Sequence, residues 1–180
     1  MNAPEQSTAL TVQVRAAPPM TQDYLKKHLH YDPETGIFTR LIANSPASSV
    51  GDIAGWKTKL GYIELKIDGI VYKAHRLAWL YVHGRMPAGD IDHANMIRTD
   101  NRIANIREAT RSQNEYNREK SSTNKTGFKG VSFHKAANKF VAQSCLSGKK
   151  IYLGVFDRPE DAARAYKDFA TAHHGQFART

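Results

Sequence analysis

The chain has 180 residues, of which 41% are hydrophobic, and a net charge of +9. This length accommodates one medium domain or two small ones, and the apolar content excludes wholesale disorder. The single cysteine, Cys145, excludes an internal disulfide and a Cys-rich zinc site. Residues 1–19 lack a signal-peptide pattern, and no apolar run approaches the roughly 18 residues that span a bilayer. We therefore expect a cytoplasmic protein with no membrane partner.

Positive charge is concentrated in the second half of the chain. Residues 21–72 hold six basic and six acidic side chains, whereas residues 121–180 hold ten basic and four acidic ones. Such asymmetry favours a polyanionic partner, because each phosphate that Lys or Arg neutralises releases condensed counterions. A basic, soluble surface without such a partner remains the alternative.

The first part of the chain predicts a tail followed by short strands and one helix. Residues 1–20 are rich in Ala, Pro and Gln without periodicity, which is typical of a flexible tail. Within residues 21–120, a turn at 32–36 precedes a strand at 37–40, and Asp68-Gly69 is a two-residue hairpin signal between alternating segments. Residues 74–83 have helical spacing of apolar side chains and end at a glycine.

A second helix is predicted from a capping pattern. Thr110 and Gln113 have the spacing of an N-cap residue and its N3 partner, so a helix should begin at Arg111. Asn114 then lies in the first turn of this helix or just beyond it.

The residues Asp92 and His93 are the candidate chemical centre. A carboxylate next to an imidazole, faced by the amide of Asn114, has the groups to hold one hard divalent cation and one base. Oxygen ligands from Asp and Asn suit Mg²⁺ or Mn²⁺ better than zinc.

The C-terminal part predicts three strands and a helix. Residues 121–127 are polar and turn-rich and are interpreted as a linker, followed by strands at about 129–134, 139–146 and 150–156 and a helix over 157–174. Asp157 and Glu160 have capping-box spacing at the start of this helix. The strand alternation leaves one polar, basic sheet face of a shape that fits a major groove, formed by Ser132, His134, Lys139, Gln143, Cys145, Lys150 and Tyr152.

The segment from about residue 21 to 120 resembles the HNH endonucleases. Asn101, Asn105 and Asn114 follow His93 by eight, twelve and twenty-one residues, and this spacing after Asp92-His93 is similar to the His-Asn-Asn variant found in phage-encoded and homing enzymes. The resemblance implies a ββα-metal fold in which His93 is the general base. It also implies that Asp92 and Asn114 ligate one Mg²⁺ or Mn²⁺ ion and that Asn105 orients the histidine by fixing the intervening loop.

Other polar residues near this motif are assigned supporting roles. Asn101 is interpreted as a turn cap, and His75 as a residue for packing or phosphate contact rather than for catalysis. The arginines Arg102, Arg107 and Arg111 are expected to clamp DNA phosphates, with a solvated face as the alternative.

Residues 128–180 resemble the AP2 DNA-binding domain. The matching strings are Phe128-Lys129-Gly130-Val131, Lys139-Phe140-Val141-Ala142, Tyr152-Leu153-Gly154-Val155-Phe156 and Glu160-Asp161-Ala162-Ala163-Arg164-Ala165-Tyr166. The resemblance implies that the outer sheet face contacts DNA through Ser132, His134, Lys139, Gln143, Lys150 and Tyr152. Ser132, His134 and Cys145 stand where plant members carry base-reading arginines, so no target sequence is implied.

Together these patterns predict an α+β protein: a ββα-metal core preceded by short β-hairpins and followed by a three-stranded antiparallel sheet with one helix. The implied function is a metal-dependent DNA endonuclease that nicks or cuts double-stranded DNA as a monomer or dimer, in a bacterial or phage-infected host cell. The alternative is a catalytically inactive DNA-binding regulator. An RNA-binding module ranks last, because neither an aromatic RNP pattern nor a GXXG clamp is present.

Overall fold

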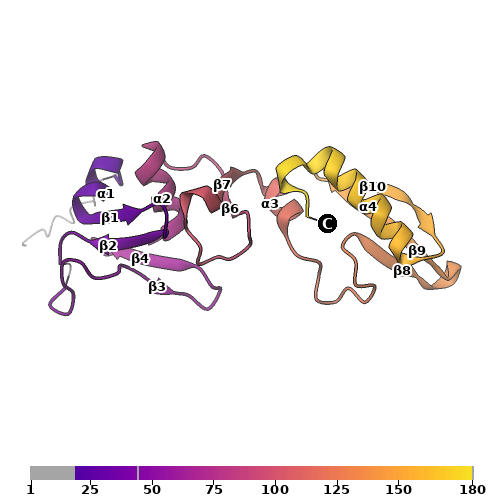
Figure 1. The fold of residues 1–180 in the computed structure, drawn as a ribbon, viewed down its shortest axis with the longest axis horizontal. Coiled ribbons are helices and arrows are strands. Elements are labelled where there is room, and N and C mark those ends of the chain that lie inside the picture. Colours follow the sequence, from indigo (N-terminus) through magenta and orange to yellow (C-terminus); the bar gives the residue numbers. More distant parts are fainter. Residues whose placement is uncertain (1–18, 44, 180) are drawn as a thin grey trace, which may run out of the picture.

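The computed structural model describes residues 19–43 and 45–179, so nearly all of the predicted N-terminal tail lies outside the described residues. The fold is mixed α+β, as predicted, and Figure 1 shows two lobes that follow one another along the long axis. The helix α3 (Arg111–Asn117) lies between them. No helix in the described ranges is long and apolar enough to cross a membrane.

The N-terminal lobe consists of two helices, a hairpin and a small antiparallel sheet. Its elements are α1 (Gln22–His28), β1 (Leu29–Asp32), β2 (Ile37–Arg40), β3 (Trp56–Lys57), β4 (Ile63–Ile67), β5 (Ile70–Lys73) and α2 (Ala74–His83). Asp68 and Gly69 both have positive φ, as the two-residue turn between β4 and β5 requires. The predicted hairpin and the helix that ends at Gly84 are therefore confirmed.

The core of this lobe is aromatic and aliphatic. Tyr31 is buried with its ring 4.8 Å from that of Phe38 and 5.6 Å from that of Tyr81. Its hydroxyl donates a hydrogen bond to the carbonyl oxygen of Asn101. The core thus fixes the backbone of a loop that lies seventy residues later in the chain.

Two short strands and α3 follow this core. The strands β6 (Asp90–His93) and β7 (Ile106–Ala109) pair antiparallel, with Asp92 opposite Arg107. The Thr110 side chain accepts from the backbone N–H of Gln113, and the Gln113 side chain accepts from that of Thr110. The predicted capping box and helix start are confirmed, and this ββα arrangement is compatible with an HNH core.

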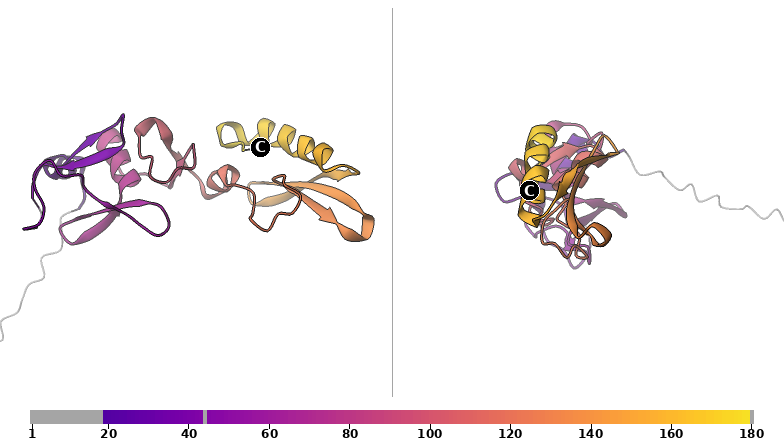
Figure 2. Two further views of the ribbon diagram at one scale, coloured as in Figure 1. Left: turned by 60° about the horizontal axis from the view of Figure 1, so that its bottom comes forward. Right: turned by 90° about the vertical axis from the view of Figure 1, so that its right-hand side faces the viewer.

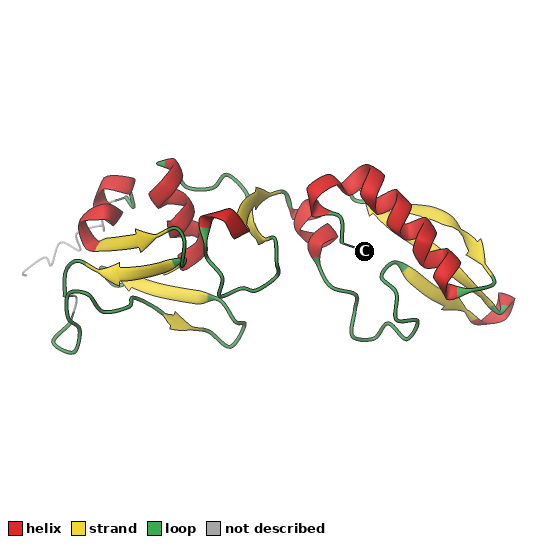
Figure 3. Ribbon diagram, in the orientation of Figure 1, coloured by secondary structure: helices red, strands yellow, loops and turns green. Residues whose placement is uncertain are grey.

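The C-terminal lobe is a three-stranded antiparallel sheet with one face covered by a helix (Figures 2 and 3). The strands lie in the order β10-β9-β8, and the elements are β8 (Val131–His134), β9 (Lys139–Leu146), β10 (Lys149–Phe156) and α4 (Pro159–His174). Ala162 and Val131 are buried between the helix and the sheet, together with Ala142.

The capping box expected at the start of α4 is wrong. Arg158 is the N-cap residue and makes no side-chain capping bond, so the helix begins at Pro159 and not at residue 157. The carboxylate of Asp157 instead accepts from the Lys139 ammonium at 2.7 Å. A long-range ion pair therefore occupies the side chain that the local pattern assigned to the helix.

The two lobes meet around α3 and the segment that follows it. The Lys129 ammonium donates to the carbonyl oxygens of Tyr116 and Arg118, both at 2.6 Å. The Tyr116 ring stacks on that of His174 at 3.8 Å, and its hydroxyl accepts from the backbone N–H of Ser147. The end of α3 is thus anchored to the C-terminal lobe.

Gly36 provides a test of how the N-terminal lobe supports the loop at Asn101. Its φ is +73°, and a Cβ there would lie 2.6 Å from the Asn101 carbonyl carbon and closer still to the Arg102 nitrogen. We expect Gly36→Ala to lower the free energy of unfolding by about 2–4 kcal/mol, because backbone strain and a backbone clash combine. Chemical denaturation measures the effect.

Gly69→Ala is the matched control, because its φ is also positive but a Cβ would meet nothing within 4 Å. It should lose only the conformational part, about 1 kcal/mol. Equal losses in the two variants would contradict the proposed clash.

Candidate functional site

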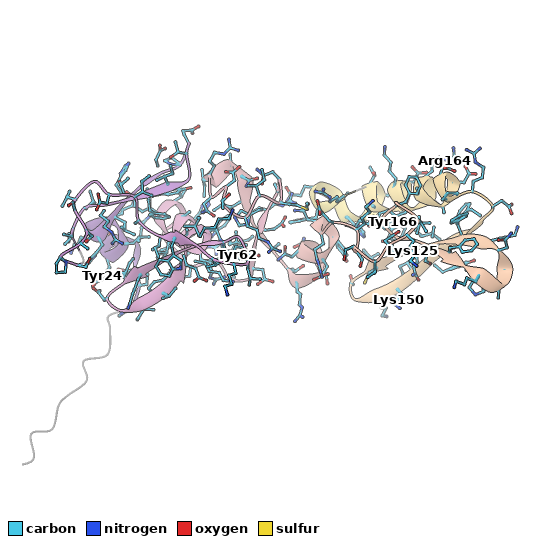
Figure 4. All side chains as sticks on the ribbon, turned by 90° about the horizontal axis from the view of Figure 1, so that it is seen from below. Tyr24, Tyr62, Lys125, Lys150, Arg164 and Tyr166 are labelled. Atoms are coloured by element: carbon cyan, nitrogen blue, oxygen red, sulfur yellow. The ribbon has the colours of Figure 1, made fainter. Side chains whose placement is uncertain are left out.

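Asp92 and His93 lie at the end of β6 and line one cavity of about 750 Å³. Both side chains are buried, with relative exposures of 4% and 5%. The cavity also brings together residues of both lobes, including Tyr62 (labelled in Figure 4), Met96, Arg98, Asn114, Asn117, Arg118 and Lys129.

The Asp92 carboxylate has two polar partners from different elements. Its Oδ2 accepts from Arg107 Nε at 2.8 Å and lies 2.7 Å from Arg107 Nη2. Asn117 Nδ2 lies 2.9 Å from Oδ1 and 3.1 Å from Oδ2, and 2.9 Å from the His93 carbonyl oxygen. Because a buried carboxylate needs compensation, these contacts explain how Asp92 remains inside the lobe.

Asn114 and Asn117 have different places on α3. Asn114 lines the cavity with Asp92, but within the described chain its side chain makes no hydrogen bond. Asn117, which the motif spacing did not indicate, makes the direct contact with Asp92. The two are three residues apart and share one face of the helix, so helical periodicity was the signal that could have identified Asn117.

The chemistry of these donors fits a hard divalent cation. Asp92 Oδ1 accepts from Asn117 alone among the described residues, which leaves a lone pair, and Asn114 contributes an amide oxygen to the same cavity. No group of three His, Cys, Asp or Glu side chains suited to a metal occurs in residues 19–43 and 45–179. Mg²⁺ commonly needs only one or two protein oxygens, with water and substrate phosphate completing its shell.

Asn101, which the sequence suggested as a turn cap, holds His93 in one orientation. The Nε2 of His93 lies 3.2 Å from Asn101 Oδ1, so Asn101 is a partner of the imidazole and not a turn cap. An amide oxygen is only an acceptor, and with this amide orientation Nε2 carries the proton and Nδ1 is the basic nitrogen. Burial lowers the pKa of His93, with the Asn101 bond opposing, so the ring is neutral at pH 7.

Asn105 spans the loop that follows His93. Its Oδ1 accepts from the backbone N–H of Asn95 at 3.0 Å, and its Nδ2 donates to the carbonyl oxygen of Asp100 at 2.8 Å. The side chain is buried at 7% exposure. These bonds join the two ends of the loop, at Asn95 and Asp100.

The three candidate arginines differ in their surroundings. Arg102 pairs with Asp100, and Arg111 is exposed without an ion pair among the described residues. Arg107 faces Asp92 and also contacts the C-terminal segment: Nη1 donates to the Gln176 carbonyl oxygen at 2.7 Å, and the guanidinium lies 3.9 Å from the Phe177 ring centroid.

Most of the residues expected on the outer face of the C-terminal sheet are exposed. Ser132, His134, Gln143, Lys150 and Tyr152 are exposed. The remaining members of this face are Cys145, which is half-buried, and Lys139, which is paired with Asp157.

His75 lies beside His93, and its burial makes the stability of the fold depend on pH. The ring centroids are 5.1 Å apart, and His75 Nδ1 is buried without a hydrogen-bond partner in the described structure. Burial, reinforced by the nearby His93, Lys73 and Arg76, lowers the pKa of His75 from 6.5 to about 3. The folded protein therefore binds this proton much more weakly than the unfolded chain.

Folding lowers the pKa of His75, so the unfolded chain takes up a proton at a higher pH than the folded protein. The free energy of unfolding is therefore unaffected by His75 above pH 6.5 and falls as the pH drops toward 3. Relative to pH 7, we expect wild-type protein to lose about 2–3 kcal/mol at pH 4.5 through this group. His75→Phe should remove that part of the loss in denaturation curves measured at both pH values. Parallel pH dependence in the two proteins would show that His75 is not its source.

Comparison with known families bears on the segment that forms this site. Comparisons with curated proteins and with solved structures gave no match. A family model does match residues 72–116, which begin in β5 and end in α3. This region contains Asp92, His93 and Asn114 but neither Asn117 nor the C-terminal lobe. The family is that of the HNH endonucleases, so the match supports the interpretation of this region as an HNH nuclease that acts on DNA.

Proposed function

We propose that this protein is a metal-dependent DNA endonuclease that hydrolyses phosphodiester bonds at the cavity lined by Asp92, His93 and Asn114. The observation that carries the proposal is the shared cavity: a carboxylate with a free lone pair, an imidazole, and an amide that makes no hydrogen bond to the described residues all line it. The match of residues 72–116 to the HNH endonucleases supports the same activity.

In this proposal His93 is the general base. Its Nδ1 makes no hydrogen bond to any described residue and is not among the fully buried unpartnered atoms. It takes a proton from water, the water oxygen attacks phosphorus, and the bond to the 3′ oxygen breaks. The leaving 3′ oxygen takes a proton from solvent, which leaves a 5′-phosphate and a 3′-hydroxyl. Asn101 keeps the proton on Nε2 throughout, and Asn105 fixes the loop that follows His93.

Asp92 and Asn114 are the proposed ligands of one Mg²⁺ or Mn²⁺ ion. A cation bound there supplies charge stabilisation at the leaving 3′ oxygen. Arg107 holds Oδ2 of the carboxylate and Asn117 bonds to Oδ1, whose second lone pair is left for the ligand role.

The C-terminal lobe is the proposed grip on double-stranded DNA, in the manner of an AP2 domain. Its sheet presents the exposed side chains of His134, Gln143, Lys150 and Tyr152 on the face opposite α4. Arg111 lies nearby and lines a cavity together with Gln143 and Lys150. A polar, basic sheet face of this kind suits phosphate contacts and base-edge contacts in a major groove.

The decisive test is cleavage of supercoiled plasmid with Mg²⁺, Mn²⁺ or EDTA. Wild-type protein should produce nicked or linear DNA only with the metal, and His93→Ala should lose at least a hundred-fold in rate while its DNA affinity changes less than two-fold. His83→Ala, which alters a histidine outside the cavity, is the control. Cleavage at the wild-type rate by His93→Ala would exclude the base assignment. An inactive wild-type protein that still binds DNA would favour the regulator.

Asn114 and Asn117 separate the ligand from its support. Asn114→Ala should weaken Mn²⁺ binding about ten-fold in calorimetry without changing the melting temperature, because it removes a ligand that makes no hydrogen bond. Asn117→Ala should instead lower the free energy of unfolding by about 1–3 kcal/mol, because it leaves polar atoms of Asp92 and His93 unpaired. Normal Mn²⁺ affinity in Asn114→Ala would contradict the assigned ligand set.

A further inference from the structure

A second cavity, of about 960 Å³, adjoins the candidate site. It lies between residues 119–129 and the flank of α4, and it shares with the first cavity the lining residues Glu119, Lys120, Ser121, Ser122 and Lys129. The candidate site therefore continues toward the helix side of the C-terminal lobe. This direction differs from the outer sheet face, because α4 covers the opposite face.

Cations dominate the walls of this second cavity. They form what we call the basic groove: Lys120, Lys129, Arg164, Lys167 and Arg179. The only acidic residues among those that line it are Glu119 and Glu160, and Glu119 is paired with Arg179 at 3.4 Å. Lys167 is exposed and makes no ion pair among the described residues.

Lys129, which lines both cavities, makes no ion pair among the described residues. Lys129 is half-buried, and its ammonium is held by two carbonyl oxygens of the α3 terminus and by no carboxylate. Burial, together with repulsion from Arg179 and Arg118, lowers the pKa of Lys129 to about 8. A bound anion would relieve this repulsion and favour the charged ammonium.

We propose that the basic groove binds the phosphates of the DNA strand that continues from the scissile phosphate, so that the substrate contacts the flank of α4 as well as the outer sheet face. The proposal rests on the proposed nuclease function, because the groove begins where the cleaved phosphate would lie. Ser121 and Ser122 add exposed hydroxyls at the junction of the two cavities, and hydroxyls are common phosphate ligands. An acidic peptide is the competing occupant, and the experiment below distinguishes it.

The experiment compares the double variant Arg164→Glu/Lys167→Glu with a charge-matched control, Lys27→Glu/Lys57→Glu. All four side chains are exposed, and the control residues lie on the N-terminal lobe outside both cavities. Binding of a 30-base-pair duplex is followed by fluorescence anisotropy over a salt series. We expect the groove variant to lose at least ten-fold in affinity relative to the control. Its slope of log affinity against log salt should flatten by about two, one for each lost phosphate contact.

A second measurement locates the contact on the DNA. Methylphosphonate linkages that neutralise phosphates on one side of the mapped cut should weaken binding by wild-type protein but not by the groove variant, because the two changes remove the same interaction. Lys150→Glu, on the outer sheet face, should remain sensitive to these linkages. Lys167→Gln alone, which breaks no ion pair, repeats the comparison if the double variant melts at a lower temperature than the control.

The outcomes separate the two proposals. If wild-type protein cleaves DNA while the groove variant and the control bind equally well, the groove assignment is overturned and the nuclease remains. If the groove variant binds natural DNA and methylphosphonate DNA as tightly as wild-type protein does, the groove does not bind DNA. The acidic peptide would then remain as its occupant. If wild-type protein neither binds nor cuts DNA, the proposed function itself fails.

Discussion

The buried carboxylate of Asp92 is the constraint on which the candidate site depends. An ionised carboxylate at 4% exposure is costly unless charge and hydrogen bonds compensate it, and here Arg107 supplies the charge and Asn117 the remaining bonds. These two partners come from β7 and from the end of α3. Their positions therefore require the strand pairing and the helix to form together, which links the chemistry of the site to the fold of the whole ββα unit.

This compensation extends beyond the N-terminal lobe. Arg107 is held on its far side by the carbonyl oxygen of Gln176 and the ring of Phe177, and the end of α3 is held by Lys129. The C-terminal lobe thus contributes to the surroundings of Asp92 although none of its side chains contacts that carboxylate among the described residues. Removing this lobe would change the environment of the site as well as the proposed DNA contacts.

Local patterns predicted the elements, and their success and failure have physical causes. The capping box at Thr110 and the turn at Asp68-Gly69 depend on neighbours within a few residues, so the sequence was sufficient to predict them. The pattern at Asp157 failed because Lys139, eighteen residues earlier, pairs with that carboxylate. The adjacent Asp92 and His93 were identified as the candidate centre because their spacing to Asn105 and Asn114 resembles that of the HNH endonucleases; the pair alone was only suggestive.

The partners of these two residues could be predicted only in part. The opposition of Asp92 and Arg107 follows from the register of β6 and β7, which a hairpin with a long loop does not reveal in advance. Asn101 reaches His93 only because Tyr31 and the Gly36 turn fix its backbone from the other side of the lobe. Such contacts depend on tertiary packing, which composition and periodicity do not encode.

The anchoring of Lys129 on the carbonyl groups of α3 has a geometric consequence. The segment 121–127 joins two ends that are already fixed to each other, so its length does not set the separation of the lobes. If the C-terminal lobe holds a DNA site as proposed, the number of base pairs between that site and the cleaved bond is set by the folded junction. The proposed nuclease would then cut at a fixed distance from its binding site, and lengthening this loop would leave that distance unchanged.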